Sequence, residues 1–79
     1  MRTLADVVTP QTPVTMGPEA TVQEACRAMR DRRVGSVAVT NAAGRLVGIF
    51  TGRDAVCRVV AEGKDPAAAA VSDAMTANP

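Results

Sequence analysis

The stretch with the clearest chemical potential is Gly48–Asp54, in which an apolar segment runs into the start of a helix. Free backbone N–H groups and the positive end of the helix dipole make such a junction a ready phosphate site. The Thr51 hydroxyl can bond a phosphate or ribose oxygen, and Arg53 can pair with phosphate as a charged fork. Asp54, on the first helical turn, can accept hydrogen bonds from ribose hydroxyl groups, as an acidic residue does in dinucleotide-binding folds.

The same residues also have a purely structural interpretation. Thr51 and Asp54 are spaced as a capping box, in which a hydroxyl and a carboxylate satisfy the first backbone N–H groups of a helix. Thr21 and Glu24 repeat that spacing at the start of an earlier helix. The residue types alone therefore leave both capping and ligand binding open at Thr51 and Asp54.

Composition excludes several other classes of function. The chain has 79 residues, a net charge of +1, 1% aromatic residues and no histidine. Nucleic-acid binding is not expected, because there is neither a basic excess nor a set of aromatic stacking platforms. No apolar run approaches the roughly 18 residues of a membrane span, and the N-terminus does not resemble a signal peptide. Without histidine, ordinary acid–base catalysis is also improbable, so we expect no enzyme and no catalytic residue.

The two cysteines, Cys26 and Cys57, are too few and too far apart to indicate a zinc site. We expect both to be reduced and buried in a cytoplasmic protein. No metal ligands and no prosthetic group are expected. With 15 alanines and 12 valines, the core must consist of small, closely packed side chains.

Hydrophobic periodicity predicts an α+β unit in the order strand–helix–strand–strand–helix. A short strand is expected at Val14–Met16, and a helix after Thr21 presents an apolar stripe of Val22, Ala25, Cys26 and Met29. Segments 36–40 and 45–51 alternate as a hairpin. A second helix is expected over about 52–62, with an apolar stripe at Val56, Val59 and Val60 and an end at Gly63. Both helices should pack on one face of a three-stranded sheet.

An internal repeat marks the end of the chain. Residues 4–9 (Leu-Ala-Asp-Val-Val-Thr) align with residues 71–76 (Val-Ser-Asp-Ala-Met-Thr), so that Thr76 is the counterpart of Thr9. We therefore expect one unit over residues 1–63, followed at 64–79 by a linker and the start of a second repeat. The alanine run 67–70 is expected to be a spacer with little to bury.

The hairpin, its ending Gly-Ile-Phe-Thr-Gly-Arg-Asp, the preceding Arg33–Val39 and the repeated lead-in together resemble a CBS domain, the cystathionine-β-synthase motif. The resemblance covers roughly residues 3–63, and the restart at 71 resembles the tandem arrangement of that family. Two departures are Val8, where the second lead-in has the more family-like Met75, and Ala38, where the family often has proline.

The resemblance implies a β-α-β-β-α fold and a regulatory module, in which two motifs pair as a Bateman module and bind an adenosine-type ligand between them. By position, Thr51 would contact phosphate or ribose, Asp54 the ribose hydroxyls, and Arg53 phosphate. The adenine would be bordered by Val34, Gly35, Thr9 and Val14. Because family clefts use residues from both motifs, one unit supplies only half of each site.

The expected function is therefore sensing of AMP, ADP or ATP by a homodimer or by pairing with a second CBS motif, with ligand binding changing how the motifs are arranged. Two alternatives are a structural dimerisation module, in which Thr51 and Asp54 only cap a helix, and a sensor of S-adenosylmethionine.

Overall fold

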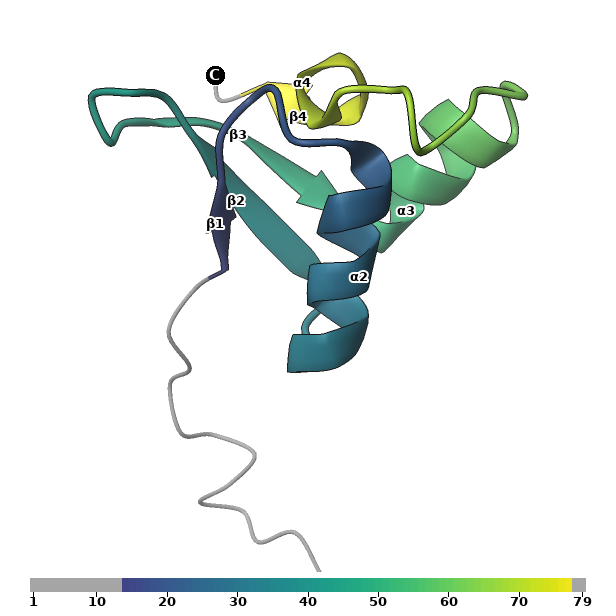
Figure 1. The fold of residues 1–79 in the computed structure, drawn as a ribbon, viewed down its shortest axis with the longest axis horizontal. Helices are drawn as coiled ribbons and strands as arrows, with labels where there is room; N and C mark the ends of the chain where they lie inside the picture. Colours follow the sequence, from purple (N-terminus) through teal and green to yellow (C-terminus); the bar gives the residue numbers. More distant parts are fainter. Residues whose placement is uncertain (1–13, 78–79) are drawn as a thin grey trace, which may run out of the picture.

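The computed structural model describes residues 14–77 of the 79-residue chain. A sheet of four strands in the order β1-β2-β3-β4 carries helices on one side (Figure 1). The expected α+β class and the β-α-β-β-α order are confirmed. The prediction of a three-stranded sheet is wrong by one strand, because β4 (Thr76–Ala77) pairs with the edge of β3. This strand belongs to the C-terminal segment, which we define as residues 64–77.

The first three strands follow the predicted hairpin and lead-in closely. β1 (Thr15–Met16) pairs in parallel with β2 (Ser36–Thr40), which pairs antiparallel with β3 (Leu46–Thr51). In the hairpin turn, the Asn41 side chain accepts hydrogen bonds from the N–H groups of Ala43 (2.9 Å) and Arg45 (3.0 Å). Gly44 has φ of +79°, a left-handed conformation that suits glycine.

Helix α2 (Val22–Arg32) begins where the sequence predicts. The Thr21 hydroxyl accepts from the Glu24 N–H at 3.1 Å, and the Glu24 carboxylate accepts from the Thr21 N–H at 3.2 Å, which completes the capping box. The helix ends at Arg33 in a left-handed conformation, with the Val34 N–H donating to the carbonyl of Met29 at 3.0 Å.

The second predicted helix is divided into α3 (Gly52–Ala55) and a π-helical turn, η1 (Val56–Val60). The expected apolar stripe is wrong at two of its three positions: Val59 is fully buried, whereas Val56 and Val60 are 60% and 68% exposed. Only Ala55 and Val59, four residues apart, face the core. Gly63 ends the helix as predicted, with φ of +69° and the Lys64 N–H bonded to the Val59 carbonyl at 2.9 Å.

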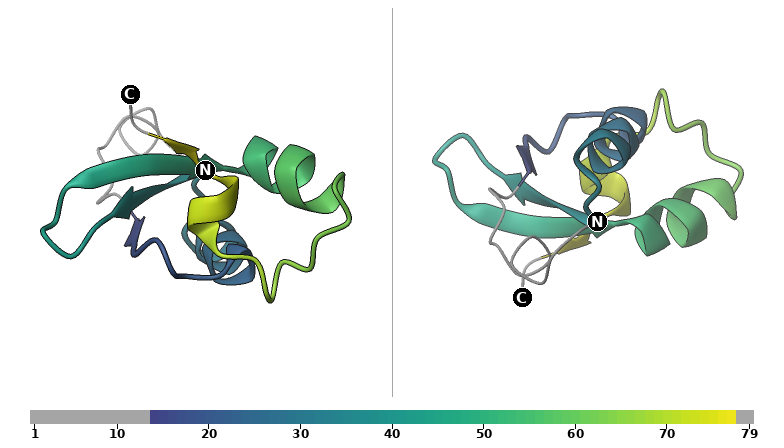
Figure 2. Two further views of the ribbon diagram at one scale, coloured as in Figure 1. Left: turned by 90° about the horizontal axis from the view of Figure 1, so that it is seen from above. Right: turned by 90° about the horizontal axis from the view of Figure 1, so that it is seen from below.

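The C-terminal segment is a structural part of the unit, and the alanine run is more than a spacer. The carbonyls of Ala69 and Pro66 accept from the N–H groups of Val22 (2.9 Å) and Gln23 (3.0 Å), so the segment satisfies the N-terminus of α2. Figure 2 shows the chain leaving η1, looping outward and returning to α4 (Val71–Ala74) beside α2. The N–H of Val71 donates to the Ala20 carbonyl at 2.7 Å.

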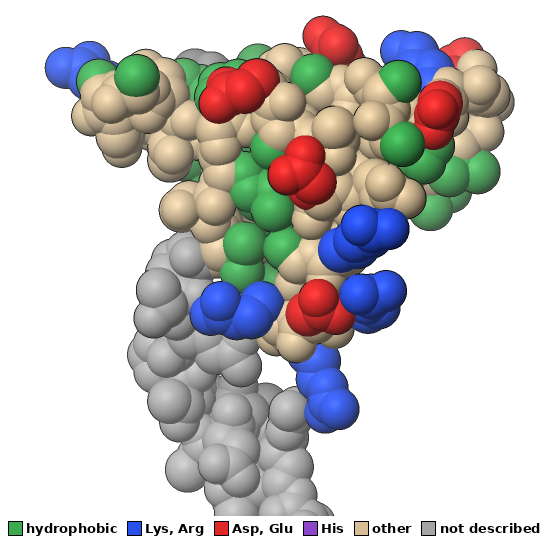
Figure 3. Space-filling model, viewed as in Figure 1, with side chains coloured by type: hydrophobic (Ala, Val, Ile, Leu, Met, Phe, Trp, Pro, Cys, Tyr) green, Lys and Arg blue, Asp and Glu red, His purple; other side chains and the backbone are tan. Residues whose placement is uncertain are grey.

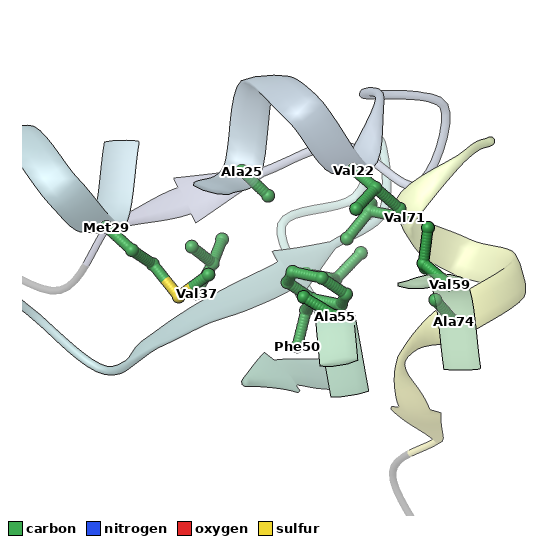
Figure 4. Close-up of a cluster of buried hydrophobic side chains, with 10 residues drawn as sticks. Val22, Ala25, Met29, Val37, Phe50, Ala55, Val59, Val71 and Ala74 are labelled. Carbon is green, nitrogen blue, oxygen red and sulfur yellow. The ribbon is translucent and has the colours of Figure 1, made fainter. Parts of the chain in front are cut away.

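The core lies between the sheet and the helices and is built from small side chains around one ring. Phe50 is fully buried at its centre, and side chains from α2, α3, η1 and α4 surround it (Figure 4). Strand alternation explains why one sheet face is covered: Val37, Val39 and Phe50 point to the helices. The buried apolar residues are Val22, Ala25, Met29, Val37, Val39, Phe50, Ala55, Val59, Val71 and Ala74.

Substitution of Val71 tests whether the C-terminal segment belongs to the cooperative core. Val71 is fully buried, so Val71→Ala should lower the free energy of unfolding by about 2 kcal/mol through lost burial and a residual cavity. The matched change Val60→Ala, at a side chain 68% exposed, should change it by less than about 0.5 kcal/mol. Urea unfolding monitored by circular dichroism measures both. Equal effects would show that the segment unfolds independently.

Candidate functional site

The candidate residues gather at one end of the sheet. Thr15 of β1, Ala38 of β2, Ile49 of β3 and Thr76 of β4 lie in one row across the four strands. Given the strand directions, β1, β2 and β4 begin at the end of the sheet where β3 finishes and α3 starts. Residues flanking these strand ends are therefore brought together, although they come from distant parts of the chain.

The capping box at the start of α3 is fully formed. The Asp54 Oδ2 accepts from the Thr51 N–H at 3.0 Å and from the Thr51 hydroxyl at 3.1 Å. The Asp54 N–H donates to the Thr51 hydroxyl oxygen at 3.2 Å. The structural interpretation of these two residues is therefore correct, and the question is what bonding capacity they retain for a ligand.

Asp54 is the one buried charged residue among residues 14–77, at 7% exposure. Its two carboxylate oxygens differ in bonding. Oδ2 is held by two short hydrogen bonds from Thr51, whereas Oδ1 has only two long contacts: 3.5 Å to the Thr76 hydroxyl and 3.7 Å to Nε of Arg58. A carboxylate oxygen can accept two hydrogen bonds, so Oδ1 retains capacity for a further donor.

A backbone hydrogen bond joins Gly52 to Gly35 next to Asp54. The Gly52 N–H donates to the carbonyl of Gly35 at 3.3 Å, which places the chain before β2 against the start of α3. Gly35 is exposed and the preceding Val34 is half-buried against the core. Arg53 is exposed. Thus Thr51, Arg53 and Asp54 share the start of α3, with Gly35 as their neighbour.

Val14, at the same end of the sheet, lies two strands away from Thr51. Val14 precedes β1, and its carbonyl accepts from the Ala38 N–H at 2.9 Å, so the whole of β2 lies between Val14 and Thr51. Thr9 lies outside the described residues. Thr76, its counterpart in the repeat, does reach Asp54.

The helix N-termini differ in how many of their first N–H groups are satisfied. In α2 the first two N–H groups donate to Ala69 and Pro66. In α3 the Gly52 N–H donates to Gly35, while the Arg53 N–H finds no acceptor within residues 14–77. The dipole and free donor of α3 therefore face outward beside the Arg53 side chain, an arrangement suited to an anion.

Other candidate groups have structural explanations. Cys26 and Cys57 are both free, as predicted, but neither is fully buried: Cys26 is half-buried and Cys57 is exposed. Burial raises the pKa of the Cys26 thiol, which favours the inert protonated form. No group of three or more cysteine and acidic side chains that could hold a metal occurs among residues 14–77. Basic side chains gather over the lower end of α2 in Figure 3, where Arg30 pairs with Asp31 at 2.9 Å.

Arg58 is the site residue that the sequence interpretation missed. Its spacing of four residues from Asp54 is the spacing at which opposite charges meet on a helix, and this signal could have revealed the pair. Its second contact, from Nη1 to the carbonyl of Met75 at 2.9 Å, joins distant segments and has no such sequence signal.

Comparison with known proteins gives a consistent result. The sequence profile described as CBS domain matches residues 4–61. The CBS domain-containing protein CBSCBSPB2 of Arabidopsis thaliana is 44% identical over 66 residues, which is 84% of this chain and 12% of that protein. A CBS-domain containing protein of Agrobacterium tumefaciens is 39% identical with a TM-score of 0.79, covering 95% of this chain and 55% of that one.

A third likeness shows the fold alone. A CBS domain protein of Pyrobaculum aerophilum, solved in complex with AMP, is 24% identical with a TM-score of 0.76 and covers 86% of this chain and 52% of that one. The chain thus spans 12% of the Arabidopsis relative and about half of each of these two solved chains. Within residues 14–77, no helix is both long and apolar enough to cross a membrane.

A methyl group at Gly48 should separate β4 from the site. A Cβ there would meet the Met75 sulfur and lie 2.9 Å from the backbone oxygen of Thr76. We expect Gly48→Ala to speed amide hydrogen exchange in residues 75–77 while leaving β2 protected. The control is Gly52→Ala, since a Cβ at Gly52 would meet nothing within 4 Å. Unchanged exchange in Gly48→Ala would contradict the tight β3–β4 contact.

Proposed function

This chain belongs to the CBS domain family, whose members are regulatory modules, and on that premise we propose that it senses an adenine nucleotide: AMP, ADP or ATP. The observation that carries the proposal is the asymmetry of Asp54. A buried carboxylate with one oxygen fixed by Thr51 and the other open to a further donor is a preorganised acceptor for a ribose hydroxyl. The AMP complex of the Pyrobaculum aerophilum protein supports the choice of ligand class.

Each residue has a distinct role in the proposed site. Asp54 Oδ1 accepts from a ribose hydroxyl, and the Thr51 hydroxyl contacts ribose or phosphate. Arg53 pairs with phosphate, aided by its own free N–H at the start of α3. Val34 and Gly35 border the adenine. Thr9 and Val14, which precede β1, also border the adenine in this proposal. The nucleotide is a regulatory ligand in this proposal and not a prosthetic group.

A second CBS motif, here a second copy of the chain, completes the site. Thr51 and Ile49 project from the uncovered face of the sheet, because the intervening Phe50 points into the core. Ile49 is 44% exposed, a large apolar side chain that residues 14–77 leave partly uncovered. A partner packed on this face would bury Ile49 and bring its own residues next to Thr51.

The mechanism that we propose for signalling is a shift between arrangements of the two motifs. A nucleotide held between them stabilises the arrangement to which it binds more tightly, by an amount equal to its difference in affinity. No catalytic step is assigned, and the chain contains no histidine to act as a general base. Two unpaired cysteines fit a reducing compartment, so we place the protein in the cytoplasm.

The two capping boxes offer a matched test of ligand binding against capping. Asp54→Ala and Glu24→Ala each remove the acidic arm of a box with the same bonding pattern, and each should cost about 1 kcal/mol of stability. Only Asp54→Ala should weaken AMP and ATP binding, by tenfold or more, because charge-assisted hydrogen bonds are worth about 1.5–3 kcal/mol. Isothermal titration measures the affinities.

The outcomes separate the three candidate functions. No nucleotide binding by a wild-type chain that sedimentation shows to be a dimer would favour a structural dimerisation module. Binding of S-adenosylmethionine that AMP cannot displace would favour the S-adenosylmethionine sensor. Equal loss of affinity in Asp54→Ala and Glu24→Ala would remove the special role given to Asp54.

A pair of lysine substitutions tests which face pairs. Ile49→Lys places a charge on the uncovered sheet face and should convert the dimer to monomer in sedimentation velocity, with loss of nucleotide affinity. Val60→Lys introduces the same charge on η1, where the side chain is 68% exposed, and should change neither property. Dissociation by Val60→Lys alone would assign the interface to the helices.

A further inference from the structure

Arg58 links the helical part of the site, α3 and η1, to the C-terminal segment. It lies in η1, and its Nη1 donates to the carbonyl of Met75, in the C-terminal segment, at 2.9 Å. Its Nε lies 3.7 Å from Oδ1 of Asp54, close enough for charge attraction but too far for a hydrogen bond. One guanidinium therefore spans the gap between the candidate carboxylate and the chain that leads into β4.

Strand β4 is a short part of the C-terminal segment's contact with the sheet. It consists of Thr76 and Ala77 and forms only two residue pairs with β3, Ile49↔Thr76 and Gly48↔Ala77. Yet its first residue places a hydroxyl 3.5 Å from Oδ1 of Asp54. The Arg58–Met75 hydrogen bond acts on the residue directly before Thr76, so it restrains the hydroxyl that approaches the carboxylate.

We propose that Arg58 is a positioning residue for the nucleotide site, an inference that rests on the function proposed above. It fixes the Met75 carbonyl, sets Thr76 beside Asp54 and holds Oδ1 in the direction of an incoming ribose hydroxyl. Because Nε stands beyond hydrogen-bond distance, Arg58 orients Oδ1 electrostatically without using its acceptor capacity. Arg58 acts through Asp54 and has no contact with the nucleotide.

The geometry calls for arginine and not merely for a positive charge. The guanidinium presents separate Nε and Nη1 donors in a rigid plane, so it can bond Met75 and face Asp54 at the same time. A lysine ammonium is a single point on a flexible stem and can satisfy only one of the two groups. Arg58→Lys should therefore have an effect between those of the wild type and Arg58→Ala.

The experiment compares binding of AMP and 2′-deoxy-AMP to wild type, Arg58→Ala, Arg58→Lys and a control, Arg45→Ala, in which an exposed arginine of the hairpin is removed. Arg58→Ala should weaken AMP binding about fivefold, the equivalent of one hydrogen bond of about 1 kcal/mol. It should weaken 2′-deoxy-AMP binding much less, because that ligand lacks the 2′-hydroxyl, one of the ribose groups that can donate a hydrogen bond to Asp54. Amide exchange should also accelerate at residues 75–77. Arg45→Ala should match wild type throughout.

The outcomes distinguish this inference from the function on which it rests. If wild type binds no nucleotide, the proposed function fails. If wild type binds AMP and Arg58→Ala binds it equally well, only the role of Arg58 fails. Equal loss for AMP and 2′-deoxy-AMP would show that Arg58 merely supports the fold, which also overturns the inference. If Arg58→Ala does not fold by circular dichroism, Arg58→Lys carries the same comparison.

Discussion

The burial of one carboxylate organises this end of the molecule. A charged group at 7% exposure is costly unless its oxygens have partners. Thr51 bonds Oδ2 of Asp54, while Arg58 and Thr76 approach Oδ1 at longer distances. Thr51 ends β3, Arg58 lies one helical turn onward, and Thr76 begins β4. The strand end, the helix start and the C-terminal segment must therefore all be in place before Asp54 has these neighbours. The stability of the unit and the shape of its candidate site depend on the same atoms.

The two capping boxes show how one local motif can have two consequences. Both have the same donors and acceptors, so the local sequence treats them alike. They differ in what lies beyond the cap. The start of α2 is closed by the carbonyls of Pro66 and Ala69, whereas the start of α3 remains open at the Arg53 N–H. Tertiary packing, and not the motif itself, leaves α3 as the helix end that can receive an anion.

Local signals predicted most of the fold. The hairpin follows from alternation and the Asn41–Gly44 turn, α2 from its capping box, and the end of η1 from Gly63, since each depends on residues a few positions apart. The stripe at Val56 and Val60 failed because the π turn changes the helical period on which such stripes are judged. The docking of the C-terminal segment could not be predicted, because it joins Val22 to Ala69 through backbone atoms that every residue carries. Thr51 and Asp54 could be identified because they are three residues apart and form a recognisable side-chain motif. The bond from Arg58 to Met75 could not, because its acceptor is a backbone carbonyl far along the chain.

The late position of the C-terminal segment has a consequence for synthesis on the ribosome. Helix α2 emerges early, but the acceptors for its first two N–H groups and the side chain of Val71 are translated more than 40 residues later. Until Ala74 has left the exit tunnel, the nascent chain carries an incomplete helix end and an uncovered apolar surface, so the unit should fold in one late step and not progressively. In a tandem array, the opening residues of each newly translated repeat would complete the folding of the repeat before it.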